Sequence, residues 1–413
     1  MKKKIFVRGP VLSQSGYGEQ ARFALRALKT REDIFEVFIQ PTPWGQTGWI
    51  WSQDEFRVWM DQRITTTQVL MHQKQLQPDI SLQVTIPNEF QKICPVNIGF
   101  TAGIETDRVS PLWLQKANDM DKVLVVSNHA KATYENTKTF MKNEETGEQL
   151  PYKLVTPITV VSETTPRKDA EEIPQLKLDY DFNFLMVSQL GPRKNFNNAL
   201  RWWVEEFIDQ EVGLLVKANI KSNSNIDWVH IEPSLQKMLQ KYPDRKCKVY
   251  LLHGDLSAGQ MAGLYTNPKI KALINISHGE GFGLPMLEAA REALPVITIG
   301  WSGQTDFLSH DGKDYFQKVD HTLQEVQPEA VWDTVIEKGS KWAHADQGSY
   351  KMTLRKTMKS WKAAKDTAEK LKTIIDDKFS DERLFSNFCN SIYEEESFEI
   401  ENWLDGLDIE EHE

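Results

Sequence analysis

Short apolar runs alternate with segments of helical periodicity along the whole chain, and this alternation constrains the fold more than any other feature. Runs that alternate with helices in this way are typical of βα units and parallel sheets. A polar, proline-containing segment, residues 162–174, separates two series and reads as a linker. The runs are 4–8, 35–40, 80–85, 96–101, 122–127 and 154–161 before it, and 182–187, 213–218, 248–253, 272–276 and 295–299 after it.

The sequence therefore predicts an α/β protein with two doubly wound, Rossmann-like domains. We place the first domain at residues 1–165, the second at 166–375, and an acidic C-terminal segment at 376–413. Two such domains joined by a hinge would place a ligand cleft between the carboxyl ends of their sheets. A length of 413 residues fits two domains better than one. The helix formers of residues 350–372 predict one unbroken helix.

Composition narrows the class of protein. Hydrophobic residues make up 40% of the chain and charged residues 26%, as in ordinary globular enzymes. The longest apolar stretches are far below the roughly 20 residues that span a membrane, and the first one is too short for a signal peptide. Three widely spaced cysteines, in no metal-ligand spacing, fit a reduced compartment. We therefore expect a cytoplasmic protein.

A glycine-edged turn between a strand and a helix is the strongest candidate site. The apolar run 272–276 leads into His278-Gly-Glu-Gly-Phe-Gly-Leu-Pro, and a helix is expected to continue to Glu292. Such a turn directs backbone N–H groups and the positive helix end toward a ligand. Glu280 lies in the turn, and Glu288 lies about two helical turns later. Backbone N–H groups that can donate hydrogen bonds to phosphate, together with two carboxylates that can accept from sugar hydroxyls, suit a nucleotide-sugar.

The ten residues from Glu280 to Ala289, EGFGLPMLEA, resemble the E-x7-E signature of the retaining glycosyltransferases of the GT-B fold, family 4. The resemblance implies that the second domain binds a nucleotide-diphosphate sugar, expected to be UDP- or GDP-linked, and that the first binds the acceptor. It implies that the turn contacts the donor sugar nucleotide. Glu280 would contact the sugar and Glu288 the ribose, and the backbone groups that would contact the donor are those of Gly281, Phe282, Gly283 and Leu284. The alternative is an ordinary glycine-rich turn of an α/β protein.

The segment after the run 182–187 resembles the family's G-R-x-x-x-R-K-N stretch, whose Arg and Lys hold the donor diphosphate. Lys194 matches the Lys, whereas Gln189 stands where the Arg usually is. Arg193 could compensate because a guanidinium binds phosphate bidentately. Lys217, at the end of the next run, is a candidate second phosphate cation. The alternatives are a solvated loop and an ordinary strand end.

Three further segments are expected to face the cleft from the first domain. Gly16 and Gly18 lie where the family has a glycine loop that touches donor or acceptor, although a plain turn explains them equally well. Glu105, Thr106 and Asp107 resemble part of an E-T-x-x-x-P-x-W arrangement and are candidates for positioning the acceptor hydroxyl, Glu105 in a catalytic role. His129 is either catalytic or a residue of the helix start.

Tryptophans gather in the loop after the second strand. The flat rings of Trp44, Trp49 and Trp51, with Trp59 beyond them, could stack on sugars or bases of the acceptor. A hydrophobic clamp that holds a long loop is an equal alternative. The sequence has no cluster with metal-ligand spacing, and the resemblance implies an enzyme that needs neither metal nor cofactor.

The acceptor is the least constrained part of the prediction. The net charge of −10 is concentrated after Asp376, whereas residues 351–372 carry eight basic side chains. That basic segment could suit a polyanion such as hydroxymethylated cytosine in phage DNA, although a solvated face is the commoner meaning; a glycan and a lipid head group are the other candidates. A non-catalytic sugar-nucleotide-binding protein and a GT-B epimerase remain alternative functions.

In the suspected family the final helix crosses back to the first domain, which we expect here through Leu384, Phe385, Phe388 and Ile392. The last dozen residues are expected to be disordered.

Overall fold

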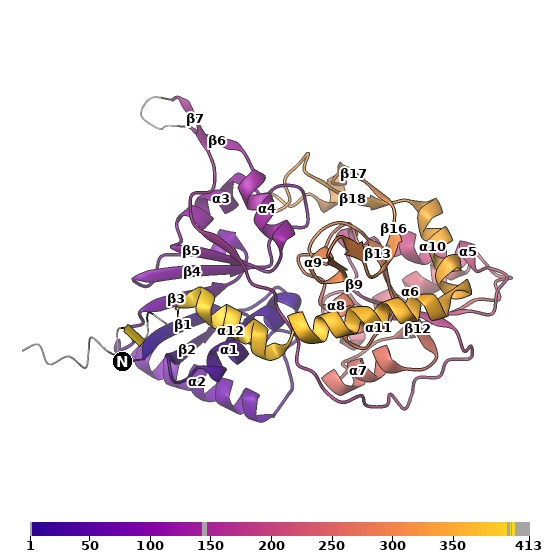
Figure 1. The fold of residues 1–413 in the computed structure, drawn as a ribbon, viewed down its shortest axis with the longest axis horizontal. Coiled ribbons are helices and arrows are strands. Elements are labelled where there is room, and N and C mark those ends of the chain that lie inside the picture. Colours follow the sequence, from indigo (N-terminus) through magenta and orange to yellow (C-terminus); the bar gives the residue numbers. More distant parts are fainter. Residues whose placement is uncertain (1, 143–146, 395–396, 398, 401–413) are drawn as a thin grey trace, which may run out of the picture.

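The protein forms two lobes, each built on a six-stranded parallel sheet (Figure 1). The computed structural model describes residues 2–142, 147–394, 397 and 399–400. The predicted fold class, two doubly wound domains that face each other, is confirmed. Within the described residues, no helix is both long and apolar enough to cross a membrane.

The N-terminal sheet has the strand order β2-β1-β3-β4-β5-β8, and all its neighbours are parallel. Its strand order reverses between β1 and β3, so this sheet has its switch point there. The strands are β1 (Lys3–Gly9), β2 (Phe35–Pro41), β3 (Ile80–Val84), β4 (Val96–Thr101), β5 (Lys122–Val125) and β8 (Ile158–Val160). The helices are α1 (Gly16–Thr30), α2 (Glu55–His72), α3 (Pro111–Asn118) and α4 (Asn128–Asn136).

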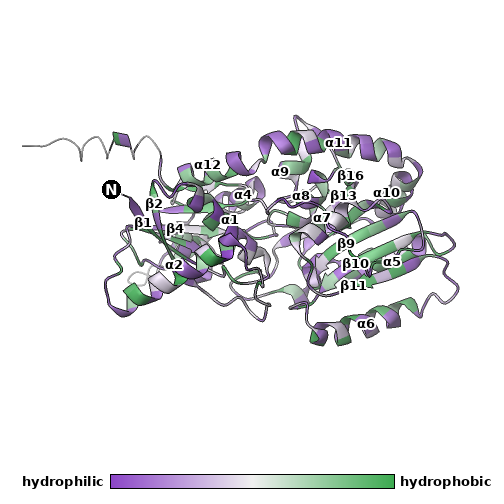
Figure 2. Cartoon of the chain, turned by 90° about the horizontal axis from the view of Figure 1, so that it is seen from below, coloured by the Kyte–Doolittle hydropathy of each residue, from purple (hydrophilic) through white to green (hydrophobic). Residues whose placement is uncertain are grey.

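The C-terminal sheet has the order β11-β10-β9-β12-β13-β16, which switches direction between β9 and β12. Its central strands are hydrophobic because helices cover both faces (Figure 2). The strands are β9 (Asn183–Gln189), β10 (Gly213–Asn219), β11 (Lys248–Leu252), β12 (Ile270–Asn275), β13 (Val296–Ile299) and β16 (Gln317–Val319). The helices are α5 (Phe196–Glu206), α6 (Asn225–Leu239), α7 (Ala258–Thr266), α8 (Leu284–Arg291), α9 (Thr305–Leu308) and α10 (Gln347–Lys359).

Several short elements lie outside the alternating pattern and were not predicted. The strand expected at 154–161 is shortened to β8, and an exposed hairpin precedes it. These elements are short antiparallel pairs of two to five residues per strand, so no long apolar run signals them. They are β6 (Thr139–Lys142) with β7 (Gln149–Tyr152), β14 (Ser309–His310) with β15 (Lys313–Asp314), and β17 (His321–Glu325) with β18 (Lys341–Ala345). The 3₁₀ turns are η1 (Pro87–Glu89), η2 (Pro192–Lys194) and η3 (Pro328–Ala330).

The prediction of one unbroken helix over 350–372 is wrong. Helix α10 ends at Lys359, and α11 (Trp361–Lys378) starts after Ser360, whose φ of −114° and ψ of 36° are not helical. The indole of Trp361 explains the break, because its Nε1 donates to the Lys271 carbonyl at 2.9 Å and the ring stacks under the Lys271 ammonium. This anchor turns the chain so that α11 runs across the second lobe toward the first (Figure 1).

The last described helix, α12 (Asp381–Ile392), packs on α1 of the first lobe (Figure 1). Its apolar stripe is the expected one. Phe388 is fully buried, with ring centroids 5.4 Å from Phe23 and 5.3 Å from Phe100, and Leu384 and Ile392 are also buried. The crossing therefore joins the two lobes at a place far from the linker in sequence. The expected disorder of the last dozen residues concerns a stretch outside the described residues.

Candidate active site

A cavity of about 680 Å³ lies between the two lobes. Its walls include segments that follow β1, β4, β9 and β12, strands at or next to the two switch points, and further segments at the carboxyl ends of β2, β8, β10 and β11. Ligands of doubly wound sheets bind at such crevices because loops on either side diverge there. The cavity is thus in the place that the fold predicts for a ligand.

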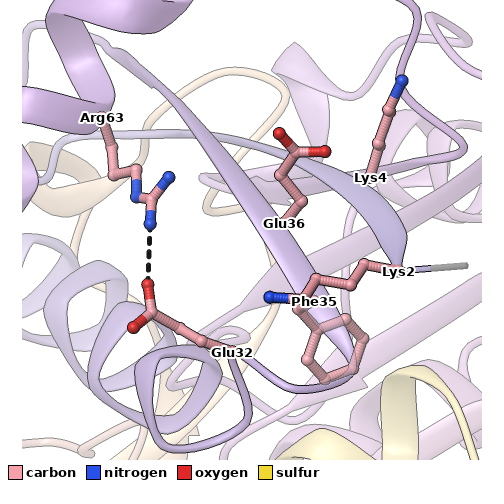
Figure 3. A pocket seen from close by; sticks show the side chains of 6 residues that line it. All are labelled: Lys2, Lys4, Glu32, Phe35, Glu36 and Arg63. Carbon is pink, nitrogen blue, oxygen red and sulfur yellow. Dashed lines mark hydrogen bonds and ion pairs between the residues drawn. The ribbon is translucent and has the colours of Figure 1, made fainter.

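A second hollow, of about 490 Å³, lies at the opposite end of the first sheet from the interlobe cavity. Figure 3 shows the side chains that line it. It sits where β1 and β2 begin rather than where they end, and an ion pair of 2.8 Å between Arg63 and Glu32 crosses it. Its lining includes none of the residues predicted to bind donor or acceptor; it consists of Lys2, Lys4, Glu32, Phe35, Glu36 and Arg63. We therefore take the interlobe cavity as the candidate active site.

The glycines of the turn let the two lobes approach closely. A Cβ at Gly279 would lie 2.7 Å from the Glu105 carbonyl oxygen, and one at Gly281 would lie 2.7 Å from the Ala102 carbonyl oxygen. Gly283 has φ of 103°, which favours glycine, and it begins α8. The spacing of glycines in this turn therefore serves the contact with the loop after β4 as well as the helix start.

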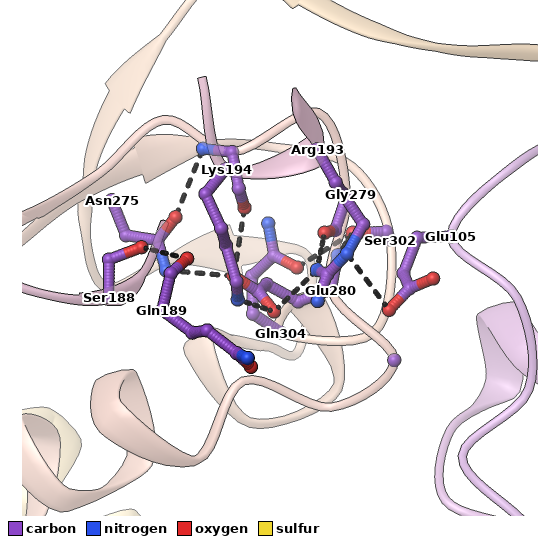
Figure 4. Close-up of polar contacts among 12 residues, drawn as sticks. Glu105, Ser188, Gln189, Arg193, Lys194, Asn275, Gly279, Glu280, Ser302 and Gln304 are labelled. Atoms are coloured by element: carbon purple, nitrogen blue, oxygen red, sulfur yellow. Dashed lines mark hydrogen bonds and ion pairs between the residues drawn. The ribbon is translucent and has the colours of Figure 1, made fainter. Parts of the chain in front are cut away.

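Glu280 lies at the centre of a polar cluster (Figure 4). Its side chain is nearly buried and accepts hydrogen bonds from Lys194 Nζ at 2.7 and 2.8 Å and from Arg193 Nη1 at 3.0 Å. Asn275 Nδ2 donates to it at 3.0 Å and Ser277 Oγ at 2.9 Å. Four neighbouring side chains therefore fix the position of the carboxylate.

The charges of this cluster balance. Burial alone would raise the pKa of Glu280, but the ion pairs with Lys194 and Arg193 hold it well below its usual range. Burial and the neighbouring Arg193 lower the pKa of Lys194. Arg193 also pairs with Glu105 of the first lobe, at 3.3 Å. Two cations thus balance two carboxylates, of which only Glu105 lies across the lobe boundary. An entering anion would compete with those carboxylates.

Glu288, in the second turn of α8, lines the same cavity as Glu280. Its carboxylate accepts a hydrogen bond of 2.9 Å from the Tyr265 hydroxyl. Burial raises the pKa of Glu288. The E-x7-E spacing therefore brings both carboxylates to one cavity, where they have different partners.

The predicted residues of the neighbouring strand ends also line the cavity. Gln189 Nε2 donates to the Ile220 carbonyl at 2.8 Å, so this side chain braces a loop in the absence of ligand. Lys217 is buried, donates to Asn223 Oδ1 at 3.1 Å, and has its pKa lowered by burial. Asn223 in turn donates to Asp255 at 2.7 Å. Asn223 and Asp255 were not predicted, although each follows a strand of the second series.

In the first lobe, the structure separates the predicted residues into two groups. Gly16, Trp44 and Glu105 line the cavity. Gly18 is not among the lining residues of the described chain; it packs against the preceding loop, because a Cβ there would lie 2.0 Å from the Ser13 carbonyl oxygen. Ser15 caps α1 by accepting from the Gly18 N–H at 3.1 Å.

Three of the predicted acceptor residues are not among the described residues that line the cavity. They pack against other parts of the protein instead. Thr106 is buried and donates to the Arg108 carbonyl at 2.8 Å. Asp107 pairs with Lys341 of β18 through two hydrogen bonds of 2.8 Å, one of them to its side chain. His129 packs edge-on against Trp301 at 4.7 Å, and burial lowers its pKa to about 4. The contacts of Asp107 and His129 cross between the lobes, whereas that of Thr106 stays within its own loop.

The tryptophans of the loop after β2 divide in the same way. Trp44 lines the cavity with its ring 4.3 Å from that of Tyr17. Trp49 and Trp51 are 64% and 83% exposed and lie outside the set of described lining residues. Trp59 packs on Phe56, and its Nε1 donates to Glu32 at 2.9 Å. Only Trp44 is therefore placed to stack on a ligand inside the cavity.

Ser127 links the helix start of α4 to the glycine turn. Its Oγ donates to the Gly281 carbonyl at 2.7 Å and accepts from the Ala130 N–H at 3.2 Å. Ser127→Ala should lower the free energy of unfolding by about 1–2 kcal/mol, because it removes a cap and leaves a buried carbonyl unpaired. Denaturant titration measures this. Ser380→Ala, which removes only the cap of α12, should cost less; equal losses would contradict a role at the lobe contact.

Glu163 follows β8 and is a buried carboxyl that lines the cavity. Burial raises its pKa to about 8 from an ordinary value of 4.5, and nearby Glu19 adds to the shift. The folded protein then binds this proton more tightly than the unfolded chain, so stability is lost as pH rises from about 4.5 to about 8. Glu163→Gln should abolish that loss. Thermal unfolding of the wild type and of Glu163→Gln at pH 5.5 and pH 8 tests this prediction. The same change in Tm with pH in both proteins would contradict it.

Groups of three or more His, Cys, Asp or Glu that could hold a metal ion are not found in the described part of the chain. The groups that line the cavity near Glu280 are instead cations, carboxylates and backbone N–H groups of α8.

Sequence comparisons with known proteins cover only part of the chain. A scan against protein-family models finds no match. The serotype-specific mannosyltransferase WbdA of Escherichia coli is 34% identical over 116 residues, which are 28% of this chain and 13% of that protein. The match thus spans only about an eighth of the curated relative.

Solved structures match over nearly the whole chain. HepE of Anabaena, in complex with UDP-glucose, has a TM-score of 0.55 at 11% identity, with 94% of this chain and 98% of that chain covered. Sucrose-phosphate synthase of Thermosynechococcus elongatus has a TM-score of 0.58 at 12% identity, with 98% and 99% covered. Together with the two facing parallel sheets, these likenesses show that the chain has the GT-B fold.

Proposed function

We propose that this protein is a retaining glycosyltransferase that moves a sugar from a nucleotide-diphosphate sugar to an acceptor hydroxyl. One observation carries the proposal: Glu280, Lys194 and Arg193 form a hydrogen-bonded cluster beside the start of α8, at the switch point of the second sheet and on the wall of the interlobe cavity. Cations and a helix start in one place suit a diphosphate.

The donor would lie along the second lobe. Lys194 and Arg193 would bind the diphosphate, together with N–H groups of residues 281–284 at the start of α8. Lys217 is the further candidate cation. Glu288 would accept from the ribose hydroxyls and Glu280 from the sugar, which requires the diphosphate to draw the two cations partly away from Glu280.

The reaction breaks the bond between the anomeric carbon and the diphosphate oxygen and forms one to the acceptor oxygen. Retention implies attack from the face that the leaving group vacates, and the acceptor proton passes to the departing phosphate. Lys194, with Arg193, would stabilise the charge that develops on that phosphate, which is often the largest catalytic contribution. No protein base is then needed, and we propose that the reaction proceeds without metal.

The acceptor would approach from the first lobe. Glu105 lies across the lobe boundary and pairs with Arg193, so it is the proposed positioning group for the acceptor hydroxyl. Trp44 offers a ring inside the cavity. The basic segment 351–372 is a weaker candidate for binding DNA, because Lys351 and Arg355 already form ion pairs with Glu205 and Glu206 at 2.7 Å.

A panel of UDP- and GDP-linked sugars tests donor binding by thermal shift. A ligand at a hundred times its Kd should stabilise the protein by about 2.7 kcal/mol. Turnover of the stabilising donor, and the anomeric configuration of its product by NMR, then test transfer and retention. An inverted product would contradict retention, and a panel without any shift would contradict the proposal as a whole.

A second candidate is a sugar-nucleotide-binding protein without catalysis. It is favoured by Gln189, which replaces a permanent cation of the resembled family and braces the Ile220 carbonyl instead. Thermal shift without donor hydrolysis or transfer to any acceptor would favour this alternative.

A further inference from the structure

The first-lobe wall of the cavity holds buried polar atoms for which the described residues supply no hydrogen-bond partner. Gln20, on α1, is 1% exposed, and neither Nε2 nor Oε1 has a hydrogen-bond partner within the described residues. Glu163 is 4% exposed, and its Oε2 likewise lacks one among them. Both residues line the cavity. Three unpaired polar atoms therefore belong to one wall of the candidate site.

Such atoms are costly to leave unpaired. A buried donor or acceptor without a partner costs about 1–3 kcal/mol, and native proteins keep few of them. Where they gather on a cavity wall, the natural explanation is a partner that arrives from the cavity. Water can fill that role in the resting protein, and a polar ligand can replace it.

The chemistry of this wall selects the kind of ligand. An amide both donates and accepts hydrogen bonds, and so does a protonated carboxyl. Burial raises the pKa of Glu163 to about 8, which keeps its proton at neutral pH. Hydroxyl groups also donate and accept, so they complement both side chains, whereas a phosphate needs donors and cations.

An aromatic pair stands on the same lobe. Tyr17 lies three residues before Gln20 on α1, so the two share one helix face. Its ring is 4.3 Å from that of Trp44, and both rings line the cavity. Tyr17 is held in place by a hydrogen bond of 2.8 Å between its hydroxyl and Thr101, at the end of β4. Rings beside uncharged hydrogen-bonding groups match the apolar face and the hydroxyls of a sugar ring.

We propose that Gln20 and Glu163, with the Tyr17–Trp44 pair, form a subsite for the hydroxyls of a sugar ring, so that the acceptor is a carbohydrate that enters the cavity. The inference rests on the proposed function and names its acceptor class. In this arrangement the acceptor lies on the first lobe, opposite the cluster of Glu280 on the second.

Saturation-transfer NMR with methyl α-mannopyranoside and methyl β-glucopyranoside, at saturating UDP or GDP, tests the subsite. The wild type should bind at least one glycoside. Gln20→Leu and Glu163→Leu should each weaken that binding by about tenfold, the equivalent of one good hydrogen bond. Glu163→Gln, which keeps an uncharged donor and acceptor, should bind nearly as the wild type does. Gln115→Leu, at an exposed position of α3, is the matched control.

The variants also report on folding. Gln20→Leu replaces an unpaired amide by an apolar side chain of similar size, so its Tm should equal or exceed that of the wild type. Nucleotide-induced thermal shifts should be unchanged in every variant. A loss of glycoside binding with intact Tm and nucleotide shift therefore supports the subsite.

Several results would overturn the inference. One is glycoside binding that is unaffected by Gln20→Leu and Glu163→Leu, which would mean that the wall holds only water. Another is a wild type that binds neither glycoside, or that binds duplex DNA in their place with strong salt dependence. A wild type that shows no nucleotide-induced thermal shift would instead contradict the proposed function. Failure of the subsite and failure of the proposed function are therefore distinguishable.

Discussion

Lys194→Ala should lower the turnover of the donor sugar nucleotide by about 10²–10³-fold, the usual cost of removing one preorganised group that stabilises a developing negative charge. Lys194 is the donor closest to Glu280, at 2.7 Å, and lies on the wall where the diphosphate is proposed to bind. Steady-state kinetics with the donor identified by thermal shift measure the effect. The fall should appear mainly in kcat, because charge on the leaving oxygen grows in the transition state.

The control for this variant is Lys362→Ala, whose side chain is 88% exposed on α11. It should leave kcat and KM unchanged. Lys194→Arg should recover only part of the rate, because a planar guanidinium does not replace a compact ammonium in a fixed geometry. Wild-type kcat in Lys194→Ala would contradict the assignment of Lys194 as the cation for the leaving group.

The glycine turn could be predicted because its constraints are local. The spacing of Glu280, in the turn, and Glu288, within α8, brings both residues to the lining of one cavity. Gly283, at the start of that helix, has a positive φ that favours glycine. Gln189 ends β9 and Lys194 lies in the turn after it, so strand order alone brings them to the same cavity. Positions at the carboxyl ends of strands are thus readable from sequence.

The contacts that loops make across the lobe boundary could not be predicted from the sequence in this way. Asp107 follows a strand as Glu105 does, yet it pairs with Lys341 of the other lobe, more than two hundred positions away. The break at Ser360 likewise depends on a carbonyl of β12 that accepts from Trp361. In both cases a distant partner decides the local structure, and no spacing rule reports it.

The polar wall of the first lobe shows a third limit. Gln20 lies within a helix whose hydrophobic pattern gives no reason to single it out, and Glu163 lies in a segment that reads as a linker. What distinguishes them is that Gln20 Nε2 and Oε1 and Glu163 Oε2 are buried beside a cavity with no hydrogen-bond partner in the described part of the chain, which only the folded structure reveals. Their role is therefore proposed from burial rather than from a motif.

Glu280→Gln should destabilise the folded protein by about 3–5 kcal/mol, the cost of removing one partner from a buried ion pair. A glutamine keeps the shape of the side chain but carries no charge, so Lys194 and Arg193 would face each other with only Glu105 to balance them. The pairing holds the pKa of Glu280 far below 4.5, its ordinary value. Its contribution to stability is therefore complete above pH 4.5 and is lost as pH falls through the folded pKa.

Denaturant titrations of both proteins at pH 7 and pH 3 test this, and the difference in the free energy of unfolding should shrink at the lower pH. Glu135→Gln, an exposed member of a surface pair with Lys131, should change stability by less than about 1 kcal/mol at either pH. Inorganic pyrophosphate should stabilise Glu280→Gln more than the wild type, because neither Lys194 nor Arg193 is then paired with Glu280. If the variant were as stable as the wild type at pH 7 and indifferent to pyrophosphate, the charge cluster would not be what organises this site.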